Sequence, residues 1–223
     1  MTGIDELLGG RGADLLEALS ETGYMIGVSL AAAVILGLPL GTLVFLTRPG
    51  GLSANRVAFT AGNLYINVIR SFPFLLLVVF LVPLTRLVYG TTFGTPAATF
   101  SLCFVAVAIY ARLVEQILRE VRPGILRVAQ VMGATLPQTM FRVLLPEARP
   151  GLVYALTSAT ISLISYSTVL GVVGGGGIGD FALRYGYQEY DYALMYVTIL
   201  VILAIVLTIQ AVGYRLSTRL DHR

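Results

Sequence analysis

Lysine is absent from this 223-residue sequence, and cysteine and histidine occur once each. Without lysine, the glycine-rich stretch at 174–177 cannot be a phosphate-binding loop, because such a loop needs a Gly-Lys-Ser/Thr sequence at the start of a helix. The single cysteine, Cys103, excludes an internal disulfide and a metal site made from a cysteine cluster. The only histidine, His222, stands in the C-terminal tail, so the usual residues for serine-type or metal-dependent chemistry are missing. We therefore expect a protein that is not an enzyme and that holds no metal or cofactor itself.

Charged side chains are also scarce. They make up 12% of the sequence, against about 25% in a soluble domain, while 57% of the residues are apolar. Five stretches of 23 to 30 residues hold few charges or none: 22–47, 57–85, 87–111, 150–179 and 192–214. About 20 apolar residues in a helix cross a bilayer, and these stretches lack the polar face of a helix in a soluble core. The sequence therefore predicts an all-α integral membrane protein with five transmembrane helices.

The basic residues, all of them arginine, flank these stretches, so the pI near 9.1 indicates membrane topology and not nucleic-acid binding. The connection at 112–149 has six arginines and three glutamates, whereas the N-terminal tail and the connection at 180–191 are mainly acidic. Short cytoplasmic loops are enriched in arginine and lysine. We therefore expect the tail at 1–19 outside the cytoplasm and the tail at 216–223 inside it. The first residues are acidic where a secretory signal is basic, so we expect no such signal.

A few residues within the predicted spans are unusual in lipid. Pro39 and Pro73 should kink the first and second spans. Arg70 is the only ionisable residue well inside a hydrophobic stretch, a position that is often functional. If the second span begins late, however, Arg70 lies at the cytoplasmic boundary and its guanidinium reaches the interface. We expect this arrangement or a structural contact. Residues that could line a solute path, but for which packing is the simpler role, are Met195, Tyr166 and Tyr196.

The third connection holds a distinctive segment at 120–152. Its uncharged core at 128–141 is too short to cross a bilayer. Proline and glycine open it at 123–124, Pro137 interrupts it and Pro146 closes it, which predicts two short helices at the cytoplasmic surface. Two interpretations remain open: an amphipathic linker that rests on lipid, or a docking element for a partner protein.

The same segment resembles the EAA signature of ABC importer permeases, in which Glu-Ala-Ala, three residues, Gly, nine residues, Ile, any residue and Leu-Pro follow one another. Here Gly133 is followed by nine residues and then by Val-Leu-Leu-Pro at 143–146. The chain is most similar to the methionine-importer permeases, with MGAT followed by LLPEARPGL, RSFPF at 70–74, YSTVLGVVGGGGIG at 166–179 and YGYQEYD at 185–191. The resemblance covers about residues 20–215. One departure is Arg127, where Arg-Val-Ala stands in place of Glu-Ala-Ala.

The resemblance implies a type I ABC importer permease fold with a permease domain at 20–215 and a coupling segment at 123–146. It also implies a homodimer in the bacterial inner membrane, with two ABC ATPase subunits that bind ATP and an extracytoplasmic substrate-binding protein. One short helix from each permease would then sit in a cleft of an ATPase subunit. Gly133 would allow close backbone approach, and a turn at Leu145 and Pro146 would transmit motion into the fourth span. The residues implied in coupling are Arg127, Val128, Ala129, Gly133, Ala134, Thr135, Leu145 and Pro146.

The glycine-rich stretch follows the fourth span, on the side where a delivered solute would arrive. Glycines permit a tight, mobile turn or a close contact with another backbone. The stretch is therefore a candidate gate or an ordinary flexible loop, and both interpretations remain open. The candidate gate or path residues are Tyr166, Val169, Gly174, Gly175, Gly176 and Gly177.

Two functions compete with an ABC permease. A secondary transporter or channel would act without an ATPase, but carriers usually place Asp, Glu or His within the membrane and often show internal repeats. The predicted spans have neither feature, and an intramembrane enzyme would need the same missing residues. The expected solute is an amino acid, most simply methionine. The sequence does not separate L- from D-methionine, nor exclude another amino acid or a short peptide.

Overall fold

The computed structural model describes residues 10–221, and every regular element in this range is a helix. The elements are α2 Gly12–Ala32, the π-helical η1 Ala33–Gly37, α3 Leu38–Thr47, α4 Arg56–Ser71, α5 Phe74–Tyr89, α6 Thr95–Glu120, α7 Pro123–Val131, α8 Leu136–Gln138, the π-helical η2 Thr139–Leu144, α9 Leu145–Val172, α10 Gly177–Phe181, the π-helical η3 Ala182–Gln188 and α11 Tyr192–Leu220. The all-α prediction is confirmed.

Four continuous helical runs are long and apolar enough to cross a membrane: Gly12–Thr47, Thr95–Glu120, Leu136–Val172 and Tyr192–Leu220. α4 and α5 pass the same test of length and composition only when they are taken together as a fifth span, and a bend of 114° separates them. The predicted kink at Pro73 is therefore a break, at which the chain leaves the helix for Phe72 and Pro73 and starts a new one. At Pro39 the chain stays helical instead, because the π-helical η1 comes just before it.

The helix ends differ from the predicted span ends. The first run starts at Gly12, the third span is shifted to Thr95–Glu120, and α11 continues to Leu220. Much of each predicted tail is therefore helical, while residues 1–9 and 222–223, with His222, lie outside the described residues. Hydropathy marks only the stretch that prefers lipid, whereas backbone hydrogen bonding continues past it.

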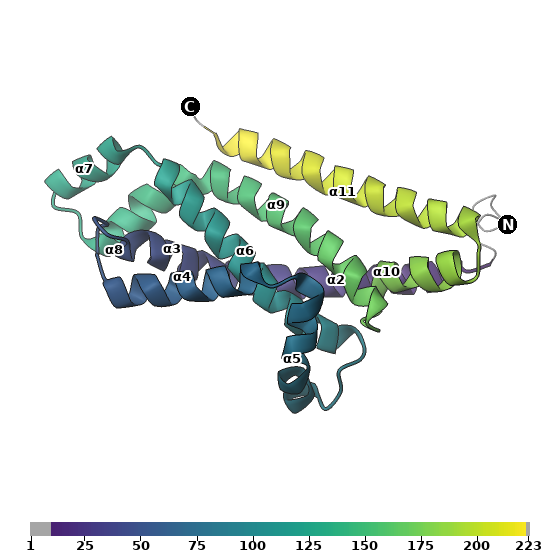
Figure 1. Ribbon diagram of the computed structural model, residues 1–223. Coiled ribbons are helices and arrows are strands. Elements are labelled where there is room, and N and C mark those ends of the chain that lie inside the picture. The colour runs from purple at the N-terminus through teal and green to yellow at the C-terminus, as the bar shows by residue number, and fades with distance from the viewer. Residues whose placement is uncertain (1–9, 222–223) are drawn as a thin grey trace.

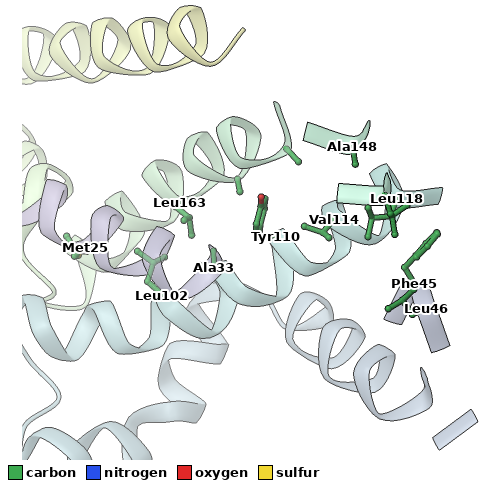
Figure 2. Packing of buried hydrophobic residues seen from close by; sticks show 14 of the residues in the cluster. Met25, Ala33, Phe45, Leu46, Leu102, Tyr110, Val114, Leu118, Ala148 and Leu163 are labelled. Carbon is green, nitrogen blue, oxygen red and sulfur yellow. The ribbon is translucent and has the colours of Figure 1, made fainter. Parts of the chain in front are cut away.

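The core lies around α6, which is 67% buried over its most apolar window, against 11% for α11. Figure 2 shows Leu102, Tyr110 and Val114 of α6 among side chains of the first run and of α9. Two glycines four residues apart, Gly37 and Gly41, let the first run approach α6 closely. A Cβ atom at Gly41 would lie 2.3 Å from the backbone oxygen of Ala111. Small residues at this spacing are a common way for membrane helices to pack.

The molecule has two distinct ends (Figure 1). α7, α8 and the C-terminal end of α11 lie at one end, and α10 lies at the other, beside the start of α2. α5 projects sideways from the middle of the bundle, and α11 runs along α9. The functional candidates therefore fall into three places: the α7 end, the α10 end and the bend between α4 and α5.

Candidate coupling and gate sites

The short helix α7 has one face against the bundle and one face exposed. Ala129 is buried, and Leu126 packs against the core, where η2 also contributes side chains. On the other side, Val128, Val131 and Met132 are 59%, 88% and 80% exposed. Such a row of bare apolar side chains at a helix end is typical of a binding surface or of contact with lipid.

Gly133 ends α7 through its backbone conformation. Its φ is +72°, in the left-handed region that residues with a Cβ rarely adopt. The N–H of Gly133 donates to the oxygen of Gln130, and the N–H of Ala134 donates to the oxygen of Ala129, which together form a Schellman motif. Within the described chain, nothing lies within 4 Å of where a Cβ of Gly133 would be. The chain therefore turns sharply here and leaves space beside the turn.

The next helix starts at Thr135 and does not stop at Pro146. The Thr135 N–H donates to Oε1 of Gln138 at 2.9 Å, and the Gln138 N–H donates back to the Thr135 hydroxyl at 3.5 Å, a capping box. Pro137 stands in the first turn, where the absence of its N–H does not matter. The predictions of a second separate surface helix and of a turn at Leu145 and Pro146 are therefore wrong. The helix is continuous, and the π-helical η2 just before Pro146 takes up its missing hydrogen bond.

The predicted coupling residues fall into two groups. Arg127, Val128, Ala129, Gly133, Ala134 and Thr135 lie together on α7 and the turn that follows it. Leu145 and Pro146 lie further along, partly buried in the start of α9. Arg127 is exposed, and no acidic residue between 10 and 221 forms an ion pair with it.

An ionic cluster between α4 and α6 was missed in the sequence. Glu115 is 1% exposed and is held by two arginines: Arg112 binds one carboxylate oxygen, and Nη2 of Arg119 lies 2.5 Å from the other. Arg112 also donates to Oδ1 of Asn63 at 3.1 Å and of Asn67 at 2.5 Å, on α4. Glu115 lies near the end of α6, beyond the predicted third span at 87–111, so the expectation that no acid lies in the middle of a span stays a prediction. The spacing Arg-x-x-Glu-x-x-x-Arg, with pairs at i,i+3 and i,i+4, could have predicted this cluster.

At the opposite end, the glycine-rich stretch forms a tight turn into α10. Gly174, Gly176 and Gly177 have φ values of +78°, +75° and +79°. The Gly94 N–H, just before α6, donates to the oxygen of Gly174 at 2.9 Å. A Cβ at Gly179 would lie 2.3 Å from the oxygen of Thr168, so α10 and α9 touch through their backbones. Both the tight turn and the close backbone contact are confirmed.

Glu21 of α2 binds this turn directly. One oxygen of its carboxylate accepts the Gly177 N–H at 2.6 Å, and the other accepts the Thr95 hydroxyl at 2.9 Å. The neighbouring Thr22 hydroxyl accepts the Ile178 N–H at 2.8 Å. α2, α6 and α10 are therefore joined by side chains of two adjacent residues. The turn is bonded on both sides, unlike an ordinary flexible loop.

The other candidate gate residues lie away from this turn. Tyr166 is less than two turns from the C-terminal end of the long helix that contains α9, and its ring packs against Phe74 with centroids 4.7 Å apart. Val169 lies one turn later. Arg70 is exposed in the last turn of α4, next to the 114° bend, and its position at the interface stays a prediction. Met195 packs against Gly186, and Tyr196 is 61% exposed on α11.

The family model for the binding-protein-dependent transport system inner membrane component matches residues 33–223. The chain is 43% identical to the probable D-methionine transport system permease protein MetI of Vibrio cholerae, over 94% of this chain and 93% of that one. It is 38% identical to the methionine import system permease protein MetP of Bacillus subtilis, over 94% and 95% of the two chains.

Among solved structures, a chain of the MetNI methionine ABC transporter, crystallised in inward-facing conformations, matches with a TM-score of 0.91. The match has 37% identity and covers 95% of this chain and 98% of that chain. The curated relatives and the solved structure match this chain over almost its whole length. This protein belongs to the binding-protein-dependent transport system inner membrane component family, as an ABC importer permease of the methionine-importer type.

Proposed function

We propose that this chain carries methionine, in the L form, the D form or both, across the bacterial inner membrane, as one half of a permease homodimer. Two separate ATPase subunits supply the energy, and an extracytoplasmic binding protein delivers the solute. The observation that supports this best is the near-complete match to permeases named for methionine and to the MetNI transporter. The second copy is proposed because five helices rarely enclose a solute path alone.

The α7 end faces the cytoplasm in this proposal, and the α10 end faces outward. Ten arginines belong to the α7 end, with four acids: Arg48, Arg56, Arg112, Arg119, Arg122, Arg127, Arg142, Arg149, Arg215 and Arg219, against Glu115, Glu120, Glu147 and Asp221. Six acids and two arginines belong to the other end: Asp14, Glu17, Glu21, Asp180, Glu189 and Asp191, with Arg11 and Arg184. The positive-inside rule favours this orientation.

The exposed face of α7 contacts the ATPase, and the glycine-rich turn acts as the outer gate. The bare side chains of Val128, Val131 and Met132 supply an apolar docking surface, and the space beside Gly133 admits a partner's backbone. The long helix from Leu136 to Val172 joins this surface to the turn at 174–177. Movement imposed on α7 by the ATPase would thus reach the turn through one continuous element.

The test is uptake by proteoliposomes that hold this permease with its own ATPase and binding protein. We expect labelled methionine to accumulate only when ATP is present on the side of the membrane where the ATPase subunits lie. We also expect the ATPase to co-purify with the permease. Equal uptake without the ATPase would contradict the proposal and favour a secondary transporter. Uptake of other solutes with no uptake of methionine would contradict the proposed substrate.

Arg127 gives a second test of the docking surface. We expect Arg127 to face an acidic or neutral surface of the ATPase, so Arg127→Glu should weaken co-purification, and high salt should reduce the defect because exposed charges are screened. The effect should be modest, because a surface pair contributes about 0–1 kcal/mol. Unchanged co-purification of Arg127→Glu at every ionic strength would place Arg127 among lipid headgroups or water.

A further inference from the structure

A cavity of about 330 Å³ lies at the bend between α4 and α5. Its walls come from four helices and include Arg70, Phe74, Ile109, Ser158, Ser162 and Tyr166. Ile109 is near the middle of Thr95–Glu120, and the other wall, formed by 158–166, is in the half of Leu136–Val172 nearer the glycine-rich turn. The cavity therefore lies between the ends of these helices. Its volume falls in the range of small-molecule sites, roughly 300–1,000 Å³.

Arg70 gives this cavity a positive charge without a counter-charge. It lies near the end of α4, and no acidic residue within 10–221 forms an ion pair with it. The helix α5 begins four residues later with no side-chain cap, so its first N–H groups also present positive charge near the bend. Arg70 is exposed, so its guanidinium is accessible to a group that enters the cavity. An anionic group that enters the cavity can bind the planar guanidinium through two hydrogen bonds.

Two serines supply the opposite kind of polar atom. The Ser158 hydroxyl donates to the Tyr154 oxygen, and the Ser162 hydroxyl donates to the Ser158 oxygen, each at 3.1 Å. Each hydroxyl has one proton and two lone pairs. Since the protons are used within α9, the lone pairs are left to accept hydrogen bonds. An ammonium group, which only donates, suits these two oxygens.

The remaining walls are apolar and partly aromatic. Phe74 and Tyr166 pack together with ring centroids 4.7 Å apart, and Val105, Ile109 and Leu113 of α6 line the facing side. A thioether or another apolar chain packs well against aromatic rings. The cavity thus joins a cation, a pair of acceptors and an apolar wall within a small volume.

We infer that this cavity is a binding site within the membrane for a zwitterionic amino acid with an apolar side chain. Arg70 binds the carboxylate, Ser158 and Ser162 accept from the ammonium group, and the side chain packs against Phe74, Tyr166 and Ile109. The inference rests on the proposed function and names the part of the permease that holds the solute in transit. Arg70 is then the residue that admits solutes with a free carboxylate.

The test measures binding by protection of a cysteine in the complete permease–ATPase complex. Ile109→Cys places a thiol in the apolar wall, in a Cys103→Ser background that removes the natural thiol. L-methionine should slow alkylation of this cysteine by a small permeant maleimide, whereas L-methioninamide, which lacks the carboxylate, should not. Ser165→Cys, exposed on the same helix α9, is the matched control and should react at the same rate with or without methionine.

Arg70 is then changed in the complex that already carries Ile109→Cys and Cys103→Ser. Arg70→Gln should raise the methionine concentration for half-protection about tenfold or more, as expected when a charge-assisted pair is lost, and Arg70→Lys should restore part of it. Arg86→Gln, near the far end of α5 and outside the cavity, should leave protection unchanged. Equal protection by methionine and methioninamide, or unchanged protection in Arg70→Gln, would overturn the inference. The comparison of the two solutes needs no change at Arg70, so it holds even if Arg70→Gln fails to assemble.

Uptake separates this inference from the proposed function. If the unaltered complex imports methionine but the cysteine at 109 is never protected, the cavity assignment fails and the methionine permease stands. If the unaltered complex imports no methionine, the proposed function fails, whatever the cysteine shows.

Discussion

At the α7 end, the backbone conformation explains why position 133 is a glycine. Gly133 has a φ of +72° and no neighbour within 4 Å of its missing Cβ in the described chain. Space alone would admit a larger residue, but the left-handed conformation would not. Its position in the sequence motif therefore has a physical reason that is independent of any partner.

A pair of substitutions at Gly133 separates conformation from size. Gly133→Val should strain the turn by about 1–2 kcal/mol and loosen the end of α7, because a β-branched residue fits the left-handed region poorly. Gly133→Asn should be nearer to normal, since Asn enters this region more readily. The measurement is the ratio of methionine imported to ATP hydrolysed in proteoliposomes, which we expect to fall in Gly133→Val.

Gly124 provides the control for that experiment. It lies in the first turn of α7 with open space around it and an ordinary backbone conformation, so Gly124→Ala should keep the ratio unchanged. A normal ratio in Gly133→Val, with normal assembly, would show that the shape of this turn is not needed for coupling.

Glu115 is a second residue whose effect can be estimated. Its buried carboxylate neutralises Arg112 and Arg119, so Glu115→Gln leaves two arginines without their charge partner. Removing one partner of a buried ion pair costs about 3–5 kcal/mol, and the lower end applies here because Arg119 is half exposed. We expect a clear fall in the thermal unfolding temperature of the purified complex. Glu120 is exposed near the end of the same helix, so Glu120→Gln should unfold at the same temperature as the original protein. Equal unfolding temperatures for the two variants would contradict the estimate.

At the scale of elements, the hydrophobic stretches predicted the helices but not their directions. The bend between α4 and α5 lies inside one apolar run, 57–85, because Pro73 changes where the chain points without changing its hydropathy. The third span was placed too early for a related reason. A hydropathy pattern ends a span at the first charges, whereas α6 continues through Arg112 and Glu115, which satisfy each other.

The candidate sites were predictable to a similar degree. The spacing around Gly133 marked the candidate coupling segment, but the sequence placed its turn at Leu145 and Pro146, whereas the structure has the turn at Gly133. The link from Glu21 to Gly177 joins residues 156 positions apart, so no local pattern could predict it. The cavity at Arg70 likewise depends on how four helices meet.

The joint between α2 and α10 offers a test at this scale. Glu21→Ala removes the acceptors for the Gly177 N–H and the Thr95 hydroxyl, so the amide of Gly177 should exchange with solvent faster. A bond to a charged group contributes about 1.5–3 kcal/mol, which corresponds to an increase of roughly 10- to 150-fold in the exchange rate. Hydrogen exchange measured by mass spectrometry over residues 174–181 would detect the change.

Glu17 is the matched control, since its side chain lies one turn earlier on α2 and, within the described residues, forms no hydrogen bond with the glycine-rich turn. Exchange in Glu17→Ala should equal that of the original protein. If Glu21→Ala also leaves the turn protected, the turn is held by the glycine contacts with α9 and not by α2.

At the scale of the whole molecule, the charges divide between two ends, and the described termini follow them. α2 starts at the acidic end, and α11 finishes at the arginine-rich end (Figure 1). A reporter fused after Arg223 should therefore be active only in a form that works in the cytoplasm. A reporter fused before Met1 should be active only in a form that works outside it. Termini on the same side of the membrane would contradict both the orientation and the odd number of crossings.

The continuous helix Leu136–Val172 also sets a mechanical scale for the protein. Its 37 residues, at 1.5 Å per residue, make a rod about 55 Å long. A rod of this length works as a lever: tilting it by about 5° displaces its far tip by roughly 5 Å, close to the rise of one helical turn. If the π-helical η2 moves as part of this rod, a small displacement at Thr135 becomes a shift of about the width of a side chain at the glycines.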